Sequence, residues 1–92
     1  MNLRLDLSKR ARKFLDQLPP KQFRQVVSKL FDLMADPERH DVQPLKGSPY
    51  LRADIGEYRI VFTVDAETET LRVPLTGNRN DGAVYDEVRR LS

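Results

Sequence analysis

The chain has 92 residues, no cysteine and a formal net charge of +2, with 33% of its residues charged. A chain this short is expected to fold as one domain, residues 1–92, and without cysteine it forms neither disulfides nor thiolate metal sites. It contains no signal-peptide pattern and no apolar run approaching the roughly 20 residues of a membrane span, so we expect a cytoplasmic protein with no membrane contact.

Positive charge is concentrated in the first third of the chain. Residues 1–30 carry eight Lys and Arg against two acids, whereas residues 31–69 carry four against nine. Such an excess is typical of a surface that meets nucleic acid or an acidic protein, and it is equally typical of a solvated helix face.

The N-terminal third predicts one strand and two helices. Leucines alternate over residues 2–7 and predict a half-buried strand. Ser8 then offers an N-cap for a helix that ends at Pro19, and Pro20 opens a second helix that runs to residue 35. So tight a corner predicts an antiparallel helical hairpin whose shared apolar side covers a sheet.

The middle of the chain predicts a loop followed by a β-hairpin. Residues 35–49 hold three prolines and a glycine, which indicates a loop. From residue 50 the pattern has period two, and YLRADI and EYRIVFTV, joined at Gly56-Glu57, predict a hairpin in which Asp54 lies opposite Arg59. One face of this hairpin is expected to be core, and it carries Leu51, Ala53, Ile55, Tyr58, Ile60, Phe62 and Val64.

The last third predicts one further strand and a short closing helix. In LRVPLT we expect Leu71, Val73 and Leu75 to point inward and Arg72, Pro74 and Thr76 to point outward, with Pro74 at an edge or in a bulge. The closing helix has Val84, Val88 and Leu91 on its apolar side. The fold class is therefore α+β: a small, twisted, mainly antiparallel sheet of about four strands packed on an N-terminal helical hairpin, with a short C-terminal helix.

Four arginines are candidates for a binding site. Arg52, Arg59 and Arg72 are predicted on the sheet face away from the helices, and Arg79 follows the last strand. Asp54 offers Arg59 a purely structural ion pair, but one carboxylate cannot neutralise four guanidinium groups. Guanidinium groups bind phosphate oxygens bidentately, so this face is also a candidate cradle for phosphate or nucleic acid. No Asp/Glu/His cluster has metal-ligand spacing, and we expect no metal and no cofactor.

Residues 45–88, LKGSPYLRADIGEYRIVFTVDAETETLRVPLTGNRNDGAVYDEV, closely resemble the C-terminal half of RelE-like toxins of bacterial type II toxin–antitoxin systems. The shared features are an L-x-G loop, a G-[DE]-Y-R-[IV] strand and an R-x5-Y ending. The preceding strand and helical hairpin fit the same fold, so the resemblance covers nearly the whole chain. GEYRI alone is shared across the wider RelE/ParE superfamily, whereas the ordered set with Arg79 and Tyr85 is more specific.

The resemblance implies a metal-independent endoribonuclease, an mRNA interferase that inhibits translation. In that family the RNA 2′-hydroxyl attacks the adjacent phosphate, and the protein positions that phosphate and stabilises its growing charge. The implied partners are a cognate RelB-like antitoxin, messenger RNA in the ribosomal A site and the 70S ribosome.

The resemblance also implies roles for single residues. Arg59 matches the arginine that holds the scissile phosphate, Arg79 the arginine that stabilises the transition state or the leaving oxygen, and Tyr85 the tyrosine that stacks on a base or assists proton transfer. We expect Arg52, Arg72 and Lys46 to bind RNA.

Asp54 is where this chain departs from the family, which has a second basic residue there. We expect Asp54 to modulate the rate, and it is also a candidate general base. Structural alternatives stay open, because Arg79 can cap a backbone carbonyl and Tyr85 can be a core residue. The rival functions are a ParE-like DNA gyrase inhibitor, which acts by protein binding, and a catalytically weak relative retained as a binding module.

Overall fold

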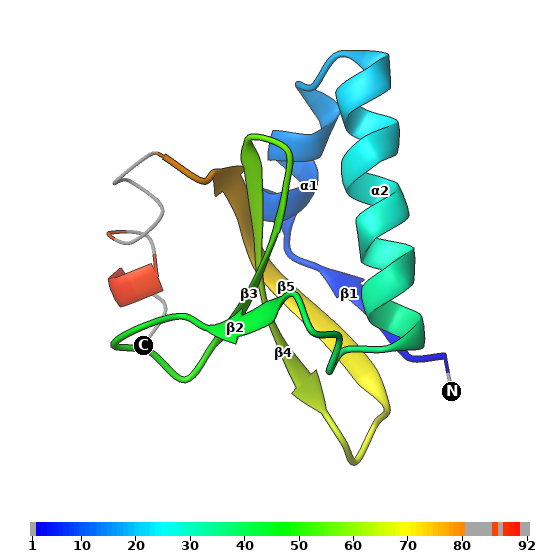
Figure 1. Ribbon diagram of the computed structural model, residues 1–92, viewed down its shortest axis with the longest axis vertical. Helices are drawn as coiled ribbons and strands as arrows, with labels where there is room; N and C mark the ends of the chain where they lie inside the picture. The colour runs from blue at the N-terminus through cyan, green and yellow to red at the C-terminus, as the bar shows by residue number, and fades with distance from the viewer. Residues whose placement is uncertain (1, 81–85, 87, 91–92) are drawn as a thin grey trace.

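The computed structural model describes residues 2–80, 86 and 88–90. Its elements are, in chain order, β1 (Arg4–Leu7), α1 (Lys9–Asp16), α2 (Pro20–Ala35), β2 (Val42–Pro44), β3 (Leu51–Ile55), β4 (Tyr58–Asp65) and β5 (Thr70–Asn78). The strands form one sheet of order β1-β5-β4-β3-β2, in which β1 runs parallel to β5 and the other neighbouring strands are antiparallel. Figure 1 shows α1 and α2 together on one side of this sheet, which confirms the predicted α+β fold.

Both predicted helices form where their caps place them. The Ser8 hydroxyl accepts a hydrogen bond from the Ala11 N–H at 3.0 Å and donates one to the Pro74 carbonyl at 2.7 Å, so the cap of α1 is also tied to β5. Pro20 is the first residue of α2, where its missing N–H costs no hydrogen bond.

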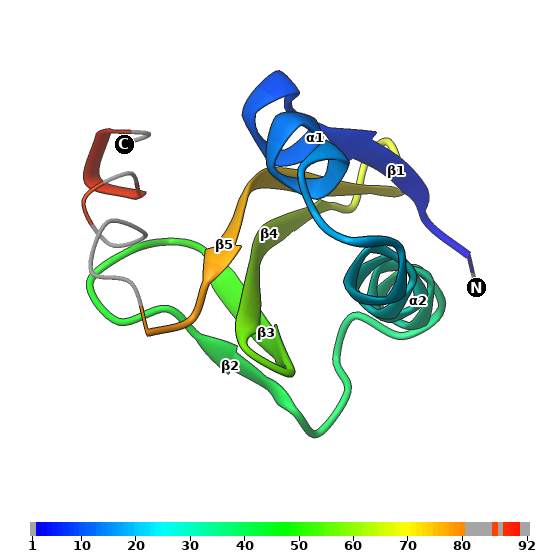
Figure 2. The ribbon, with the colours of Figure 1, turned by 90° about the horizontal axis from the view of Figure 1, so that it is seen from above.

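The main core lies between the helices and the inner face of the sheet. In Figure 2 the molecule is seen from above, with α1 and α2 on one side of the strands and residues 86 and 88–90 on the other. The fully buried side chains of this core come from both helices and from the strands, and they include Leu15, Leu30, Leu33, Ile60, Phe62 and Leu71. Val64 was also predicted in the core but is exposed near the end of β4.

A β-bulge in β5 reverses the predicted faces of its second half. Val61 pairs with Leu75 but Thr63 pairs with Arg72, so Phe62 of β4 faces two residues of β5, Val73 and Pro74. The predictions that Leu75 points inward and Thr76 outward were therefore wrong. Leu75 packs on the outer face, and the buried Thr76 hydroxyl donates to the Ala11 carbonyl at 3.2 Å. Pro74 lies in the bulge of a strand that is interior to the sheet, not at its edge.

The segment predicted to be a loop, residues 35–49, contains the short edge strand β2, so the sheet has five strands where about four were expected. Three residues are too few for a period-two pattern to emerge from the sequence. The segment is tied to α2 by an ion pair between the buried Lys29 and Asp41.

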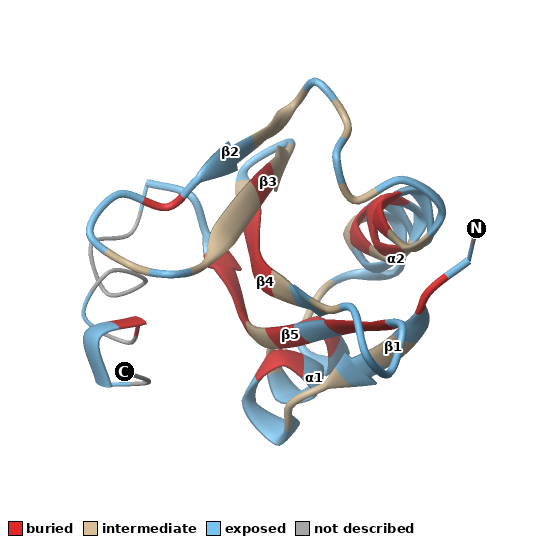
Figure 3. Ribbon diagram, turned by 90° about the horizontal axis from the view of Figure 1, so that it is seen from below, coloured by how far each residue is buried: buried red, intermediate tan, exposed pale blue. Residues whose placement is uncertain are grey.

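A second, smaller core covers part of the outer face, the face of the sheet away from α1 and α2. It consists of Leu45, Val61, Leu75 and Val88, with Tyr50 packed against it. Figure 3 shows buried residues on both sides of the strands. Residues 86 and 88–90 are helical, in agreement with part of the predicted closing helix, whose other residues lie outside the described ones. No helix among the described residues has both the length and the apolar composition required to cross a bilayer.

Candidate functional site

The β3–β4 hairpin brings Asp54 and Arg59 together as the alternation predicted. Gly56 has a φ of +58°, which a tight hairpin turn requires and which glycine adopts without strain. The resulting register places Asp54 directly opposite Arg59. The guanidinium donates from Nε to Asp54 Oδ1 at 2.7 Å and from Nη2 to Oδ2 at 3.1 Å, so the pair is bidentate.

Arg59 is buried although it is always charged: only 7% of its surface is exposed. A charge so far from water needs a partner of opposite sign, and Asp54 provides it. Asp54 itself keeps 26% of its side chain exposed, so the carboxylate forms the solvent-facing side of the pair. A phosphate that reaches Arg59 must therefore compete with Asp54 for the guanidinium.

Arg52 is the second cation on this carboxylate. Its Nη1 lies 3.1 Å from Asp54 Oδ2, and its Nη2 donates to the Gln43 side chain at 2.8 Å. Gln43 comes from β2, the strand that the sequence did not predict, and it pairs with Arg52 in the sheet register. One carboxylate thus serves two arginines, and Gln43 holds the second one in place.

Arg79 is the third cation near Asp54. Its backbone N–H donates to the Glu57 carbonyl at 2.9 Å, which fixes the end of β5 beside the hairpin turn, and the residue is exposed. The hydrogen bond from Arg59, with the charges of Arg59, Arg52 and Arg79, holds the pKa of Asp54 below its ordinary value against the opposing effect of burial. Asp54 is therefore ionised at neutral pH and is a weak base.

These four residues, Arg52, Asp54, Arg59 and Arg79, form what we call the arginine site. Two guanidinium groups contact the carboxylate and a third acts on it by its charge, so the four residues carry two positive charges in excess. Such a site has the charge and the donors to hold a phosphate group. Within the described ranges no group of three or more His, Cys, Asp or Glu side chains is placed to hold a metal ion.

Arg72 lies on the predicted face but not in the arginine site. Arg72 of β5 pairs with Thr63 of β4. Thr63 is four residues along β4 from Arg59, so at about 3.3 Å per residue the two positions are roughly 13 Å apart. The Arg72 guanidinium lies 3.0 Å from Asp6 and 3.1 Å from Asp65. The sequence could not show this, because Asp6 reaches Arg72 only through the parallel pairing of β1 with β5.

The remaining predicted residues lie elsewhere. Lys46 is exposed in the loop after β2, where it lines a cavity with Val88 and Arg89. Tyr85 lies outside the described residues. Gln43, which holds Arg52 of the arginine site, is the contact that sequence reasoning missed, and nothing in a proline-bounded loop pattern indicated it.

The family model of the ParE toxin of type II toxin–antitoxin systems (parDE) matches residues 5–80. The chain is a type II toxin of the RelE/ParE superfamily. Its fold agrees with this assignment, because the free E. coli toxin RelE, in a mutant form, superimposes with a TM-score of 0.82 at 26% identity, over 99% of this chain and 98% of that one.

Two solved complexes contain further toxins similar to this one. The toxin–antitoxin complex RelBE2 of Mycobacterium tuberculosis matches with a TM-score of 0.76 at 28% identity, over 86% of this chain and 100% of that chain. The RelE–RelB complex of Pyrococcus horikoshii matches with a TM-score of 0.73 at 25% identity, over 89% and 100% of the respective chains. No curated protein matches this toxin.

Proposed function

We propose that this toxin is a ribosome-dependent endoribonuclease that cuts messenger RNA and so inhibits translation. The observation that carries the proposal is the arginine site, where the guanidinium groups of Arg52 and Arg59 contact a single carboxylate and the charge of Arg79 acts on the same carboxylate. The similarity to RelE over nearly the full length of both chains supports the same function.

The chemistry requires little more than charge and position. The RNA 2′-hydroxyl loses its proton and its oxygen attacks the adjacent phosphorus. The new O2′–P bond forms as the P–O5′ bond breaks, and the leaving O5′ takes up a proton, so no proton is gained or lost overall. The products are a 2′,3′-cyclic phosphate and a free 5′-hydroxyl. Arg59 binds the scissile phosphate in this scheme, and Arg79 stabilises the charge on the departing oxygen. Tyr85 stacks on a base or moves the proton, as the resemblance implies.

Asp54 regulates the strength of phosphate binding in this account. Because it already occupies the Arg59 guanidinium with two hydrogen bonds, the substrate phosphate must displace it. Its pKa is held low by Arg59, so it is a poor proton acceptor and we do not assign it as the general base. Arg52 and Lys46 complete the proposed RNA contacts.

We infer a cognate antitoxin as the partner that neutralises the toxin in the cytoplasm. The solved complexes of RelE with RelB support this inference. An apolar groove of about 210 Å³ between β1, α1 and α2, lined by Leu5, Leu7, Phe23, Val27 and Phe31, fits one face of an amphipathic antitoxin helix. Phe31, which is 60% exposed, is the largest apolar surface offered there.

A second function has one observation in its favour. The matching family model is that of ParE, and a gyrase inhibitor needs no phosphate site, so the burial of Arg59 against Asp54 would then be purely structural. Two assays on the same purified toxin separate the functions. We expect new 5′-hydroxyl ends in ribosome-bound message and unchanged gyrase supercoiling; loss of supercoiling with intact message would refute the nuclease.

A further inference from the structure

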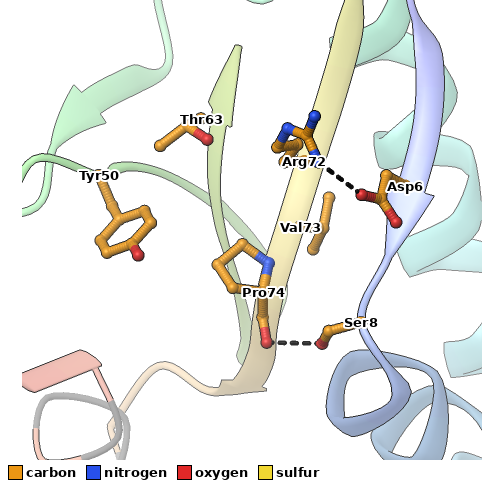
Figure 4. A pocket seen from close by; sticks show the side chains of 7 residues that line it. All are labelled: Asp6, Ser8, Tyr50, Thr63, Arg72, Val73 and Pro74. Atoms are coloured by element: carbon orange, nitrogen blue, oxygen red, sulfur yellow. Dashed lines mark hydrogen bonds and ion pairs between the residues drawn. The ribbon is translucent and has the colours of Figure 1, made fainter. Parts of the chain in front are cut away.

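A cavity of about 230 Å³ opens on the outer face, away from the arginine site. Figure 4 shows Tyr50 on one side of it and Arg72, Asp6 and Pro74 on the other, with Thr63 between the two sides. Its volume is below the roughly 300–1,000 Å³ typical of sites for drug-sized ligands, so one planar ring system fits better than a whole cofactor.

The polar groups of the cavity form a row across the sheet. Thr63 of β4 pairs with Arg72 of β5, and Arg72 pairs with Asp6 of β1. Tyr50 directly precedes Leu51, whose partner on β4 is Phe62, the neighbour of Thr63. Within the part of the chain that the structure describes, the hydroxyl groups of Tyr50 and Thr63 have no hydrogen-bond partner. They are therefore available to a ligand.

The charge of the cavity does not favour an anion. Among the described residues that line it, Arg72 is the one cation, and it is already paired with Asp6 and Asp65. The hydrogen bond from Arg72 holds the pKa of Asp65 below its ordinary value. Among the described lining residues the charges of Arg72 and Asp6 cancel, and Asp65 satisfies Arg72 from outside the lining. The cavity therefore has no net attraction for a phosphate or an acidic peptide and favours a neutral ligand with N–H donors.

We propose that this cavity binds a guanine base of single-stranded RNA. Guanine is the base whose Watson–Crick edge offers two N–H donors beside a carbonyl oxygen. This edge matches a carboxylate next to a guanidinium. In the proposed contact Asp6 accepts from N1–H and N2–H, and Arg72 donates to O6. The ring of Tyr50 gives the base a stacking surface, as aromatic side chains do in single-strand binding sites. In this proposal Arg72 contacts RNA through a base, whereas the sequence analysis predicted a contact with phosphate.

The inference rests on the proposed function, because it is the RNA of that reaction that crosses the outer face. Between the two sites lies the small apolar core of Leu45, Val61, Leu75 and Val88. The roughly 13 Å along β4 between Arg59 and Thr63 separates the scissile phosphate from the base that is read. The cavity therefore selects the sequence near the cut and takes no part in the chemistry.

The test is a titration of the full-length toxin with free guanosine, adenosine, cytidine or uridine, in which NMR measures the chemical shifts of the backbone amides. Guanosine should shift the amides of Asp6, Thr63 and Arg72 more than the other three nucleosides do. Asp6→Asn should weaken guanosine binding roughly tenfold, because it loses a bidentate contact. The matched control is Asp16→Asn. Asp16 and Asp6 are almost equally exposed, at 55% and 54%, and each is paired with an arginine. The Asp16→Asn variant should bind guanosine as the wild type does.

Three results would overturn the proposal: no nucleoside shifts these amides, guanosine binds Asp6→Asn as tightly as wild type, or arginine methyl ester shifts the same amides more strongly than guanosine. The last result would assign the cavity to a cationic side chain of a protein partner. The titration needs neither ribosome nor cleavage, so the two proposals can fail separately. A toxin that cuts message without binding guanosine refutes only the proposed base site in the cavity. A toxin that binds guanosine through Asp6 but cuts nothing refutes the proposed nuclease activity.

Discussion

Replacing Asp54 by asparagine measures how strongly the arginine site depends on its one carboxylate. Asp54→Asn keeps the shape of the side chain but removes its charge and one of its two acceptors for Arg59, so a guanidinium with 7% of its surface exposed loses its counter-charge. Removing one partner of a buried ion pair costs about 3–5 kcal/mol. Asp54 is 26% exposed and Arg59 has another interaction in the structure, which reduces that cost. We therefore expect the free energy of unfolding to fall by about 2–3 kcal/mol.

Urea denaturation at neutral pH measures this change, and for a domain of this size it corresponds to a fall in Tm of roughly 10–20 °C. The control is Asp16→Asn, which removes an exposed pair with Arg12 on α1 and should change the free energy of unfolding by less than about 0.5 kcal/mol. If Asp54→Asn is no more destabilised than this control, the Asp54–Arg59 pair is not the buried, coupled contact described above.

Three further predictions concern charge. The pKa of Asp54 is lower in the folded chain than in the unfolded one, so its contribution to stability is complete above about pH 4 and is lost as the pH falls below that. Asp54→Asn should therefore reduce the slope of the free energy of unfolding against pH on the acid side. Equal slopes for the variant and the wild type would contradict this. Asp41→Asn should lower the free energy of unfolding by about 2 kcal/mol in the same urea assay, because it leaves Lys29, 6% exposed, without its carboxylate; a change as small as that of Asp16→Asn would contradict it. Asp54→Asn should also bind single-stranded RNA more tightly at low salt, because Arg59 loses its competitor; unchanged binding would show that Asp54 does not compete with phosphate.

Local rules were enough to predict the helices and the central hairpin. The Ser8 cap and the two prolines bound the helices, and Gly56 between two alternating segments sets the register that brings Asp54 to Arg59. Local rules only partly predicted the bulge at Val73-Pro74. Pro74 indicated a bulge or an edge, but the sequence does not say which strand takes the extra residue, and a shift of one residue reverses every side chain that follows.

Those parts of the site that depend on distant strands could not be predicted. Arg52 is held by Gln43, which belongs to a three-residue strand without a detectable period. Arg72 was expected beside Arg59 because both alternate onto the same face. The register of β5 on β4 places Arg72 opposite Thr63, four residues from Arg59. The parallel pairing of β5 with β1 places it beside Asp6, and that pairing is long-range.

The rate at which purified toxin cuts ribosome-bound message tests the central claim most directly, with Arg79→Ala compared with Arg12→Ala. Both arginines are exposed, so neither substitution is expected to unfold the protein, but Arg79 belongs to the arginine site and Arg12 is on α1. We predict that Arg79→Ala cuts roughly a hundredfold more slowly than wild type, while Arg12→Ala stays closer to the wild-type rate. Equal rates for Arg79→Ala and wild type would contradict the assignment of this surface as a nuclease site.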